Sequence, residues 1–154
     1  FEESMRNSML RLYRDTDEAV RIEVFRFIKR SGDRYFLREA LATAKDAYFT
    51  RRSDDEQWEV ISALAAHGNL PPINLLFCGY ATSSSVWTNE HKRRVQLEAI
   101  RVLERYPTVD GVHSLKKLSR RLVGAKDIRA AAKAALDRMN ARDNGDDSSS
   151  GAAS

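Results

Sequence analysis

The chain has 154 residues, a length typical of one domain, and its formal net charge is +4. Its one cysteine, Cys78, excludes an internal disulfide framework and fits a reducing compartment, so we expect a cytoplasmic protein. No apolar run approaches the roughly 20 residues that a membrane-spanning helix needs, and no signal peptide is visible. Because the sequence begins at Phe1 rather than Met, we expect it to be a piece of a longer polypeptide.

The charge is distributed unevenly along the chain. Residues 86–142 hold 14 Lys and Arg against 6 Asp and Glu, whereas residues 1–85 hold 12 against 13. The last dozen residues are mainly Asp, Ser, Gly and Ala, a composition that cannot bury enough apolar surface to offset chain entropy. We therefore expect a folded domain over residues 1–141 and a disordered acidic, Ser-rich tail over residues 142–154.

Apolar residues recur at helical spacing through the first half of the chain and predict two pairs of helices. In the first pair, residues 2–13 precede a helix over about 17–30 that is capped by the acidic residues before it and closed by Gly32. In the second pair, a helix over 34–50 precedes one that carries Trp58 and stops at Gly68.

The second half predicts two more pairs. The first of these opens at Pro71-Pro72 and continues after a longer polar connection, residues 82–89, with a helix over 90–106 that Pro107 stops. The last pair covers residues 109–123 and about 126–141. In its first helix four apolar residues should point inward: Val112, Leu115, Leu118 and Leu122. No run with strand periodicity is convincing, so the sequence predicts an all-α fold.

The second helix of each predicted pair carries a repeated pattern of mostly apolar residues that stand four positions apart. The pattern starts at Val20, Glu56, Val95 and Ile128, so the starts lie 36, 39 and 33 residues apart. The residues directly after the starts are Arg21, Gln57, Gln96 and Arg129. A period of this length indicates a helical repeat array.

The residues from Asp17 to Ile28, and those from Ile128 to Leu136, resemble the second helix of a HEAT-type repeat, in the HEAT-like (armadillo-type) helical repeat family. The resemblance covers about residues 1–141 and implies a right-handed α-α superhelix, a solenoid of about four HEAT-like helix pairs. The motif is degenerate, because Gln replaces Arg in two repeats and Glu56 stands where an apolar residue is expected. An irregular helical bundle is the competing interpretation.

Residues that could carry catalysis are scattered. His67, His91 and His113 are isolated in three segments, whereas HEAT-type hydroxylases bind metal through repeated His-Glu pairs that this sequence lacks. There is no Gly-rich phosphate loop and no Ser in a nucleophile elbow. The sequence therefore predicts no enzyme, no cofactor and no metal, and it predicts Cys78 as a small buried residue.

Two positions after the four repeat starts come Ile22, Trp58, Leu97 and Ala130, which predict a partly apolar ridge on the open side of the array. We expect a scaffold that binds another protein or another domain of its own chain, with Trp58 as the best single contact because aromatic residues dominate interface energetics. Coverage of the ridge by neighbouring helices is the alternative. Trp87, in the Ser-rich connection, is either an exposed contact or a plug on the third pair.

Glu23, Glu59 and Glu98 stand in register, one position beyond the ridge. They could form an acidic ladder for a basic partner. Alternatively, Glu23 pairs with Arg26 and Glu98 with Arg101 at helical spacing, which contributes only a few tenths of a kcal/mol per pair.

The basic half offers a second candidate surface. Its cationic residues cluster at two helices: Lys92, Arg93 and Arg94 on one, and Lys117, Arg120 and Arg121 on the other. Such clusters could bind phosphates of nucleic acid, or anionic lipid if the chain is a cytoplasmic regulatory domain of a membrane protein. Charged residues opposite an apolar stripe are also what any solvated helix shows, so an ordinary surface is the competing interpretation.

Overall fold

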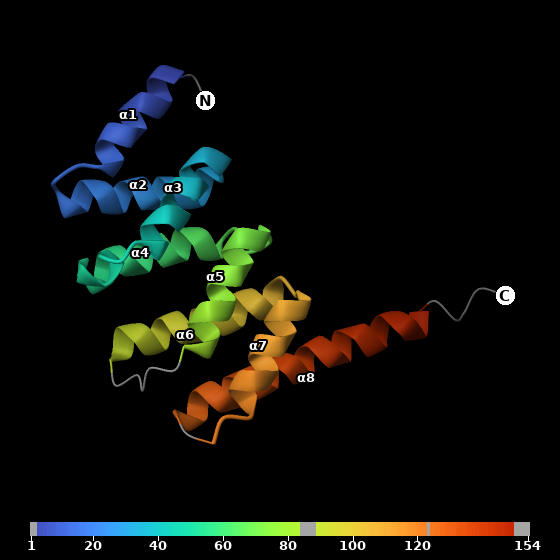
Figure 1. Ribbon diagram of the computed structural model, residues 1–154. Coiled ribbons are helices and arrows are strands. Elements are labelled where there is room, and N and C mark those ends of the chain that lie inside the picture. Colours follow the sequence, from blue (N-terminus) through green and yellow to red (C-terminus); the bar gives the residue numbers. More distant parts are fainter. Residues whose placement is uncertain (1–2, 84–88, 123, 150–154) are drawn as a thin grey trace. The chain divides into compact units, whose positions relative to one another are not determined.

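The computed structural model describes residues 3–83, 89–122 and 124–149, and within these ranges it contains eight α-helices, one short 3-10 helix and no strand (Figure 1). This confirms the predicted all-α class. None of the described helices is both long and apolar enough to cross a membrane. The chain divides into two compact units, residues 1–67 and 68–154, which are described separately below.

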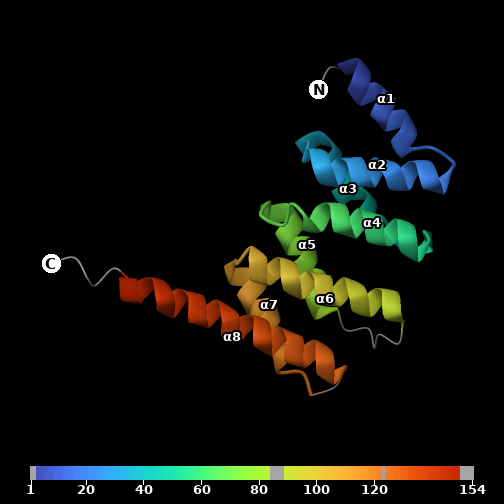
Figure 2. The same ribbon diagram turned by 180° about the vertical axis from the view of Figure 1, so that it is seen from behind.

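The first unit is built from four α-helices and the short 3-10 helix. In chain order these are α1 (Glu3–Tyr13), α2 (Glu18–Ser31), α3 (Arg34–Lys45), η1 (Phe49–Arg51) and α4 (Asp54–Ala65). Helix α1 packs against α2, and both α2 and α3 pack against α4. The views from front and back agree that α2 and α4 lie side by side (Figures 1 and 2).

Local signals in the sequence set the ends of these helices. The Asp17 carboxylate accepts the amide N–H of Ala19 at the start of α2, as the sequence predicts, and the Asp33 carboxylate does the same for Tyr35 at the start of α3. Gly32 ends α2 with φ +63°, a left-handed conformation that favours glycine. The boundary between α2 and α3 therefore lies where the capping residues predict it.

The core of the first unit consists of the apolar faces that these helices turn toward one another. Its fully buried side chains, each with 0% exposure, are Phe25, Ile28, Phe36, Ala40, Val60, Ala63 and Leu64. Burying a large apolar side chain contributes about 1.5–3 kcal/mol. The alternation of buried and exposed positions at helical spacing is what the sequence pattern predicts.

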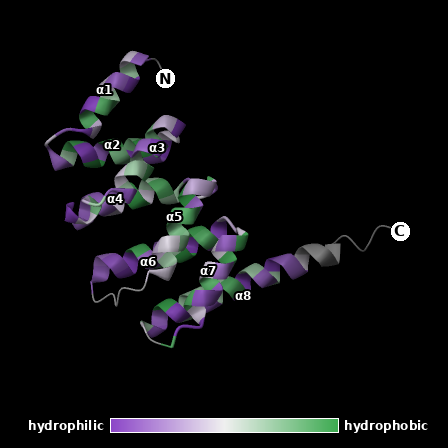
Figure 3. Ribbon diagram, viewed as in Figure 1, coloured by the Kyte–Doolittle hydropathy of each residue, from purple (hydrophilic) through white to green (hydrophobic). Residues whose placement is uncertain are grey.

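The second unit is built from α5 (Pro71–Thr82), α6 (Glu90–Arg105), α7 (Val109–Ser119) and α8 (Lys126–Ser149). Helix α5 packs against α6 and α7, and α8 packs against the same two helices. Hydrophobic and hydrophilic stretches alternate along helices such as α8 (Figure 3). The core of this unit includes Phe77, Ala99, Leu103, Leu115, Leu118, Ile128, Ala132 and Ala135.

Two predicted helices end earlier than expected. Helix α3 ends at Lys45 rather than at residue 50, because Asp46 takes an extended conformation and its carboxylate accepts the amide N–H of Tyr48. Helix α7 ends at Ser119 rather than at residue 123, and Leu122 beyond it is 94% exposed. The prediction that Leu122 points inward is therefore wrong, since the helix that would turn it inward has already ended.

The last helix is longer than the predicted one. The sequence predicts disorder from residue 142, whereas α8 runs to Ser149. Residues 140–145 are all exposed, and Arg142 among them still donates to Glu104 of α6 at 3.2 Å. The backbone hydrogen bonds of this stretch are formed within the helix and need no tertiary partner.

Candidate functional site

The two repeat arginines bind the backbone of the loop that precedes their own helix. The Arg21 Nη1 donates to the carbonyl oxygens of Asp15 and Thr16 at 2.8 and 3.0 Å. The Arg129 Nη1 donates in the same way to the carbonyl oxygens of Arg121 and Leu122, at 2.8 and 3.3 Å. Arg21 and Arg129, which share one position of the predicted pattern, thus each bind the loop before their own helix.

The glutamines at the corresponding positions of the predicted pattern also donate to backbone carbonyls, Gln57 to the segment before α4 and Gln96 to the last turn of α5. The Gln57 Nε2 donates to the carbonyl oxygen of Arg52 at 2.7 Å, and the Gln96 Nε2 donates to that of Ala81 at 2.9 Å. Both side chains are buried, at 9% and 5% exposure. An amide can therefore replace the guanidinium here, because the function of this position is to donate to backbone carbonyls.

Glu56, which breaks the apolar pattern, lies at the centre of a buried ion-pair cluster. Its carboxylate accepts two hydrogen bonds from Arg21, Nε to Oε1 at 2.7 Å and Nη2 to Oε2 at 2.8 Å, and a further one from Arg52. The Arg21 guanidinium thus pairs with a carboxylate of the neighbouring helix α4. Burial alone would raise the pKa of Glu56, but the hydrogen bonds from Arg21 and Arg52 outweigh it and leave the pKa lowered.

Polar links join α2 to α4 and place two of the predicted ridge residues on one surface of the first unit. Arg26 donates to Glu59 Oε1 at 3.0–3.1 Å, and the Lys29 Nζ donates to the Ser62 hydroxyl at 2.8 Å. Ile22 lies on the same face of α2 as these two cations, four residues before Arg26, and Trp58 lies four residues before Ser62 on α4. Both apolar side chains are partly exposed, so the ridge is neither fully covered nor fully open.

Leu97, the third ridge residue, belongs to the second unit and is also partly exposed. It lines a groove of about 330 Å³ along one face of α6, together with Glu90, Arg93, Arg94 and Arg101. Trp87 lies outside the described residues.

The three glutamates in register all have arginine partners. Arg26 lies 2.6 Å from Glu23 and also binds Glu59, and Arg101 lies 3.2 Å from Glu98. The pairing that helical spacing predicts for Glu23 and Glu98 is therefore present. A basic partner that used these glutamates would have to displace the arginines.

Two residues of the predicted basic clusters of the second unit bind neighbouring segments. Arg93 donates to Asp127 of α8 at 2.8 Å, and the hydrogen bond lowers the pKa of that carboxyl. The Arg121 guanidinium donates to the carbonyl oxygens of Thr82 and Ser83, the latter at 2.9 Å, and so caps the end of α5. The other members are exposed: Lys92, Arg94, Lys117 and Arg120. Arg121 therefore does not share an open face with Lys117 and Arg120.

Replacing Arg121 with Met should lower the free energy of unfolding of the second unit by about 1–2 kcal/mol, because the last carbonyls of α5 lose a charged donor. The measurement is urea unfolding followed by circular dichroism. Lys117→Met is the matched control and should leave the unfolding midpoint unchanged, since Lys117 is exposed. Equal shifts for the two variants would contradict the capping role.

A second carboxylate, that of Glu104, links α8 to α6. Glu104 of α6 accepts from the Nε and Nη2 of Arg138 at 2.8 and 2.9 Å, and from Arg142 one turn further along at 3.2 Å. The hydrogen bond from Arg138 lowers the pKa of the Glu104 carboxyl. Helix α8 is thus tied to α6 up to Arg142.

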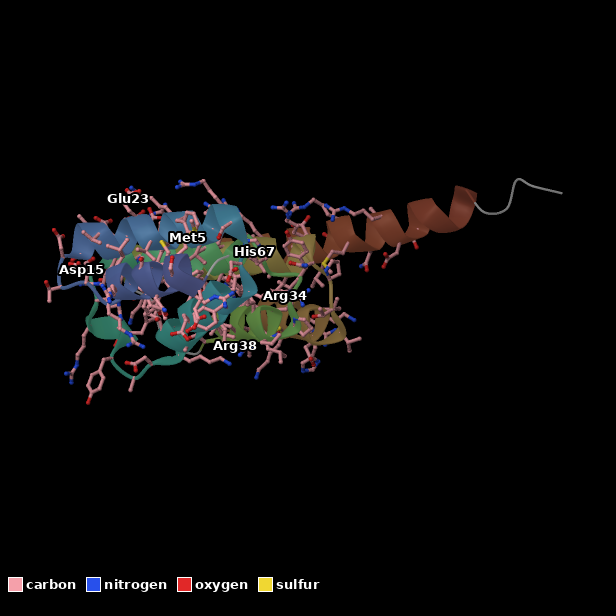
Figure 4. The ribbon with its side chains drawn as sticks, turned by 90° about the horizontal axis from the view of Figure 1, so that it is seen from above. Met5, Asp15, Glu23, Arg34, Arg38 and His67 are labelled. Atoms are coloured by element: carbon pink, nitrogen blue, oxygen red, sulfur yellow. The ribbon has the colours of Figure 1, made fainter. Side chains whose placement is uncertain are left out.

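An apolar groove of about 430 Å³ lies between α1 and α2 in the first unit. It is lined by Met9, Leu12, Ala19, Val20, Glu23, Val24 and Phe27. Figure 4 shows the side chains from above and labels Met5 on α1, Glu23 on α2 and Asp15 at the turn between these helices. Helical spacing alone does not indicate this groove, because it depends on what covers α2.

The described residues hold no cluster of three or more His, Cys, Asp and Glu that could bind a metal ion. Cys78 is buried, as predicted, and its burial raises the pKa of the thiol. No protein-family model, no curated protein and no solved structure matches this chain. Over the residues that the structure describes, the fold is an all-α arrangement of packed helices.

Proposed function

We propose that the chain is a HEAT-like helical-repeat module, a right-handed superhelix of four helix pairs, that binds another protein or another domain of its own polypeptide. The equivalent hydrogen bonds at the second position of the four repeats support the repeat architecture. They are made by Arg21, Gln57, Gln96 and Arg129. Four residues at matching sequence positions with one backbone-binding task are typical of a repeated structural unit.

The observation that carries the proposed function is the partly exposed pair Ile22 and Trp58 on the joined surface of α2 and α4. The charged groups around this pair already bind one another, as Arg26 does with Glu59. A partner can therefore cover the apolar side chains without leaving those charges unpaired. Leu97 offers a similar contact in the second unit.

Replacing Trp58 with Ala should weaken the complex at least about tenfold, because a central aromatic residue typically contributes 2 kcal/mol or more to an interface. The partner is found by placing a photo-reactive amino acid at position 22 or 97 in living cells and identifying the cross-linked protein. The affinity of that protein for the variants is then measured by calorimetry.

Tyr48→Ala is the matched control for this experiment, because Tyr48 is an aromatic residue of the first unit with 62% exposure, and it lies outside α2 and α4. It should leave the affinity unchanged. Circular dichroism verifies that both variants keep their helix content. Equal affinities of the Trp58→Ala variant and the unmodified chain would reject this surface.

Nucleic-acid binding by the second unit is a second candidate, favoured by the exposed side chains of Lys117 and Arg120 and by the arginine-lined groove on α6. Titration of labelled duplex and single-stranded nucleic acid at low and near-physiological salt tests it. Binding should fall steeply with salt and on reversal of both charges, Lys117→Glu with Arg120→Glu. A flat salt response rejects it, and the same titration with anionic lipid vesicles tests membrane docking.

A further inference from the structure

We propose that the groove between α1 and α2 binds an amphipathic helix of a partner, which lies against α2 in the way that α2 lies against α4. The groove lies on a different face of α2 from Ile22, so this proposal goes beyond the Trp58 surface. It stands or fails independently of that surface.

The repeat register identifies which positions of α4 correspond to the groove. Val20 and Glu56 are the predicted starts of successive repeats, so the groove residues Glu23 and Phe27 correspond to Glu59 and Ala63. In α4 these positions are more covered: the Glu59 side chain keeps 19% exposure and Ala63 is fully buried, as is Glu56, the counterpart of Val20, at 1%.

The element that covers this face of α4 is α2. Arg21 of α2 binds Glu56, and Arg26 of α2 binds Glu59. In α8, Ile128 corresponds to Val20 and Ala135 corresponds to Phe27. These two residues are 3% and 0% exposed, because α8 packs against α6 and α7. Only in α2, among these three helices, does the face remain partly open, with Val20 and Phe27 half-buried and Glu23 exposed.

Contacts of Tyr13 hold α1, which forms one side of the groove, in place. The Tyr13 hydroxyl, at the end of α1, donates to the carbonyl oxygen of Glu39 on α3 at 2.8 Å, and the Tyr13 ring meets the buried Phe25 of α2 edge to face. Helix α1 is therefore fixed against the unit at its C-terminal end. A preformed groove lowers the entropy cost of binding, since its walls are already ordered.

The chemistry of the groove identifies the kind of helix that fits. Its floor is apolar, and the exposed Met5 and Leu12, at 52% and 43%, extend that surface along α1. Methionine adapts to the shape of an apolar partner. Leu, Ile or Phe residues three and four positions apart on one face of a helix would fill such a groove.

Glu23 adds a charge preference to this surface. Its counterpart Glu59 accepts hydrogen bonds from an arginine of the covering helix, and the side chain of Glu23 is 65% exposed. Its present partner, Arg26, also binds Glu59, so a second cation can replace it at Glu23 without leaving Arg26 unpaired. The bound helix should therefore carry Lys or Arg beside its apolar face.

The experiment titrates the full chain into two fluorescent, hydrocarbon-stapled helical peptides of 14 residues. Both carry Leu at positions i, i+3, i+4 and i+7; one has Arg and the other Glu at the flanking positions. Anisotropy should show saturable binding of the Arg peptide. It should show binding at least about fivefold weaker for the Glu peptide, in line with a like-charge contact at Glu23.

Two variants locate the binding site. Val20→Asp places a charge in the half-buried wall of the groove and should weaken binding of the Arg peptide about tenfold or more. Ala42→Asp places the same charge at an exposed position of α3 outside the groove, and it should leave the affinity unchanged. Trp58→Ala should also leave it unchanged, which keeps this test separate from that of the proposed function.

Three results would overturn the proposal. The first is equal binding of the Arg peptide and a scrambled peptide of the same composition. The second is equal affinity of the Val20→Asp variant and the unmodified chain. The third is self-association of the chain, measured by analytical ultracentrifugation, that disappears in Val20→Asp while no peptide binds; this would assign the groove to a second copy.

Discussion

Replacing Glu56 with Gln should lower the free energy of unfolding of the first unit by about 3 kcal/mol, the lower end of the range for breaking a buried ion pair. The reason is that Arg21 and Arg52 would both lose the carboxylate that neutralises them. The loss stays at the lower end because their side chains keep 19% and 31% exposure, so water still solvates them in part. Urea unfolding followed by circular dichroism measures it.

Glu59→Gln is the matched control for Glu56→Gln. It makes the same chemical change one turn further along α4, where the partner Arg26 is exposed and solvated. The unfolding midpoint should therefore move much less. Equal midpoints for the two variants would mean that the burial of Glu56 contributes nothing to the strength of its ion pairs.

The same carboxylate makes the stability of the first unit depend on pH. Burial opposes the ionised form, but the arginine hydrogen bonds outweigh it, so the pKa of Glu56 in the folded chain lies below its ordinary value of 4.5. A lowered folded pKa contributes stability above the unfolded pKa, and that stability is lost as the pH falls through the folded pKa. The gap in unfolding midpoint between the unmodified chain and Glu56→Gln should therefore shrink below about pH 4.5. A constant gap down to pH 3 contradicts this.

Replacing Asn74 with Ala should lower the free energy of unfolding of the second unit by about 3 kcal/mol, because several buried polar groups lose their partners at once. The Asn74 amide donates to the carbonyl oxygens of Gly68 and Tyr106, both at 3.0 Å. Its Oδ1 accepts the hydroxyl of Thr108 at 2.9 Å, and Thr108 in turn caps α7 by accepting the amide N–H of Gly111. One side chain, 3% exposed, thus ties three segments together.

The matched control for Asn74 is Asn69→Ala. Asn69 is exposed in the segment just before α5, and surface substitutions of this kind usually change stability by less than about 0.5 kcal/mol. Urea unfolding of both variants gives the comparison. If Asn74→Ala moved the midpoint no further than Asn69→Ala, the buried bonds to Gly68 and Tyr106 would not stabilise the fold.

The parts of this fold that could be predicted from sequence are those set by local signals. Asp17 caps the second helix, Gly32 closes it, and Pro71 opens the fifth, because each acts within one or two residues of the helix end. The positions that face the core follow from helical spacing in the same way. Leu115 and Leu118 are buried as expected, whereas Leu122 is exposed because the helix ends before it.

The parts that could not be predicted depend on residues far apart in the chain. A glutamate at an apolar position is the only sequence signal for the buried cluster of Glu56, and its main partner, Arg21, lies 35 residues away. Arg121 fits an exposed basic face equally well until the end of α5 is placed beside it. The placement of Ile22, Trp58 and Leu97 follows from spacing, but how far each is covered depends on neighbouring helices.

The polar links between helices have a consequence for how the chain folds. Several of them join residues 33 to 39 positions apart, from Arg26 with Glu59 to Arg121 with Thr82. Each of these links joins helices that are close to one another in the order of the chain, and none joins its two ends. Native contacts can form pair by pair as the polypeptide leaves the ribosome, before the C-terminal helices are synthesised.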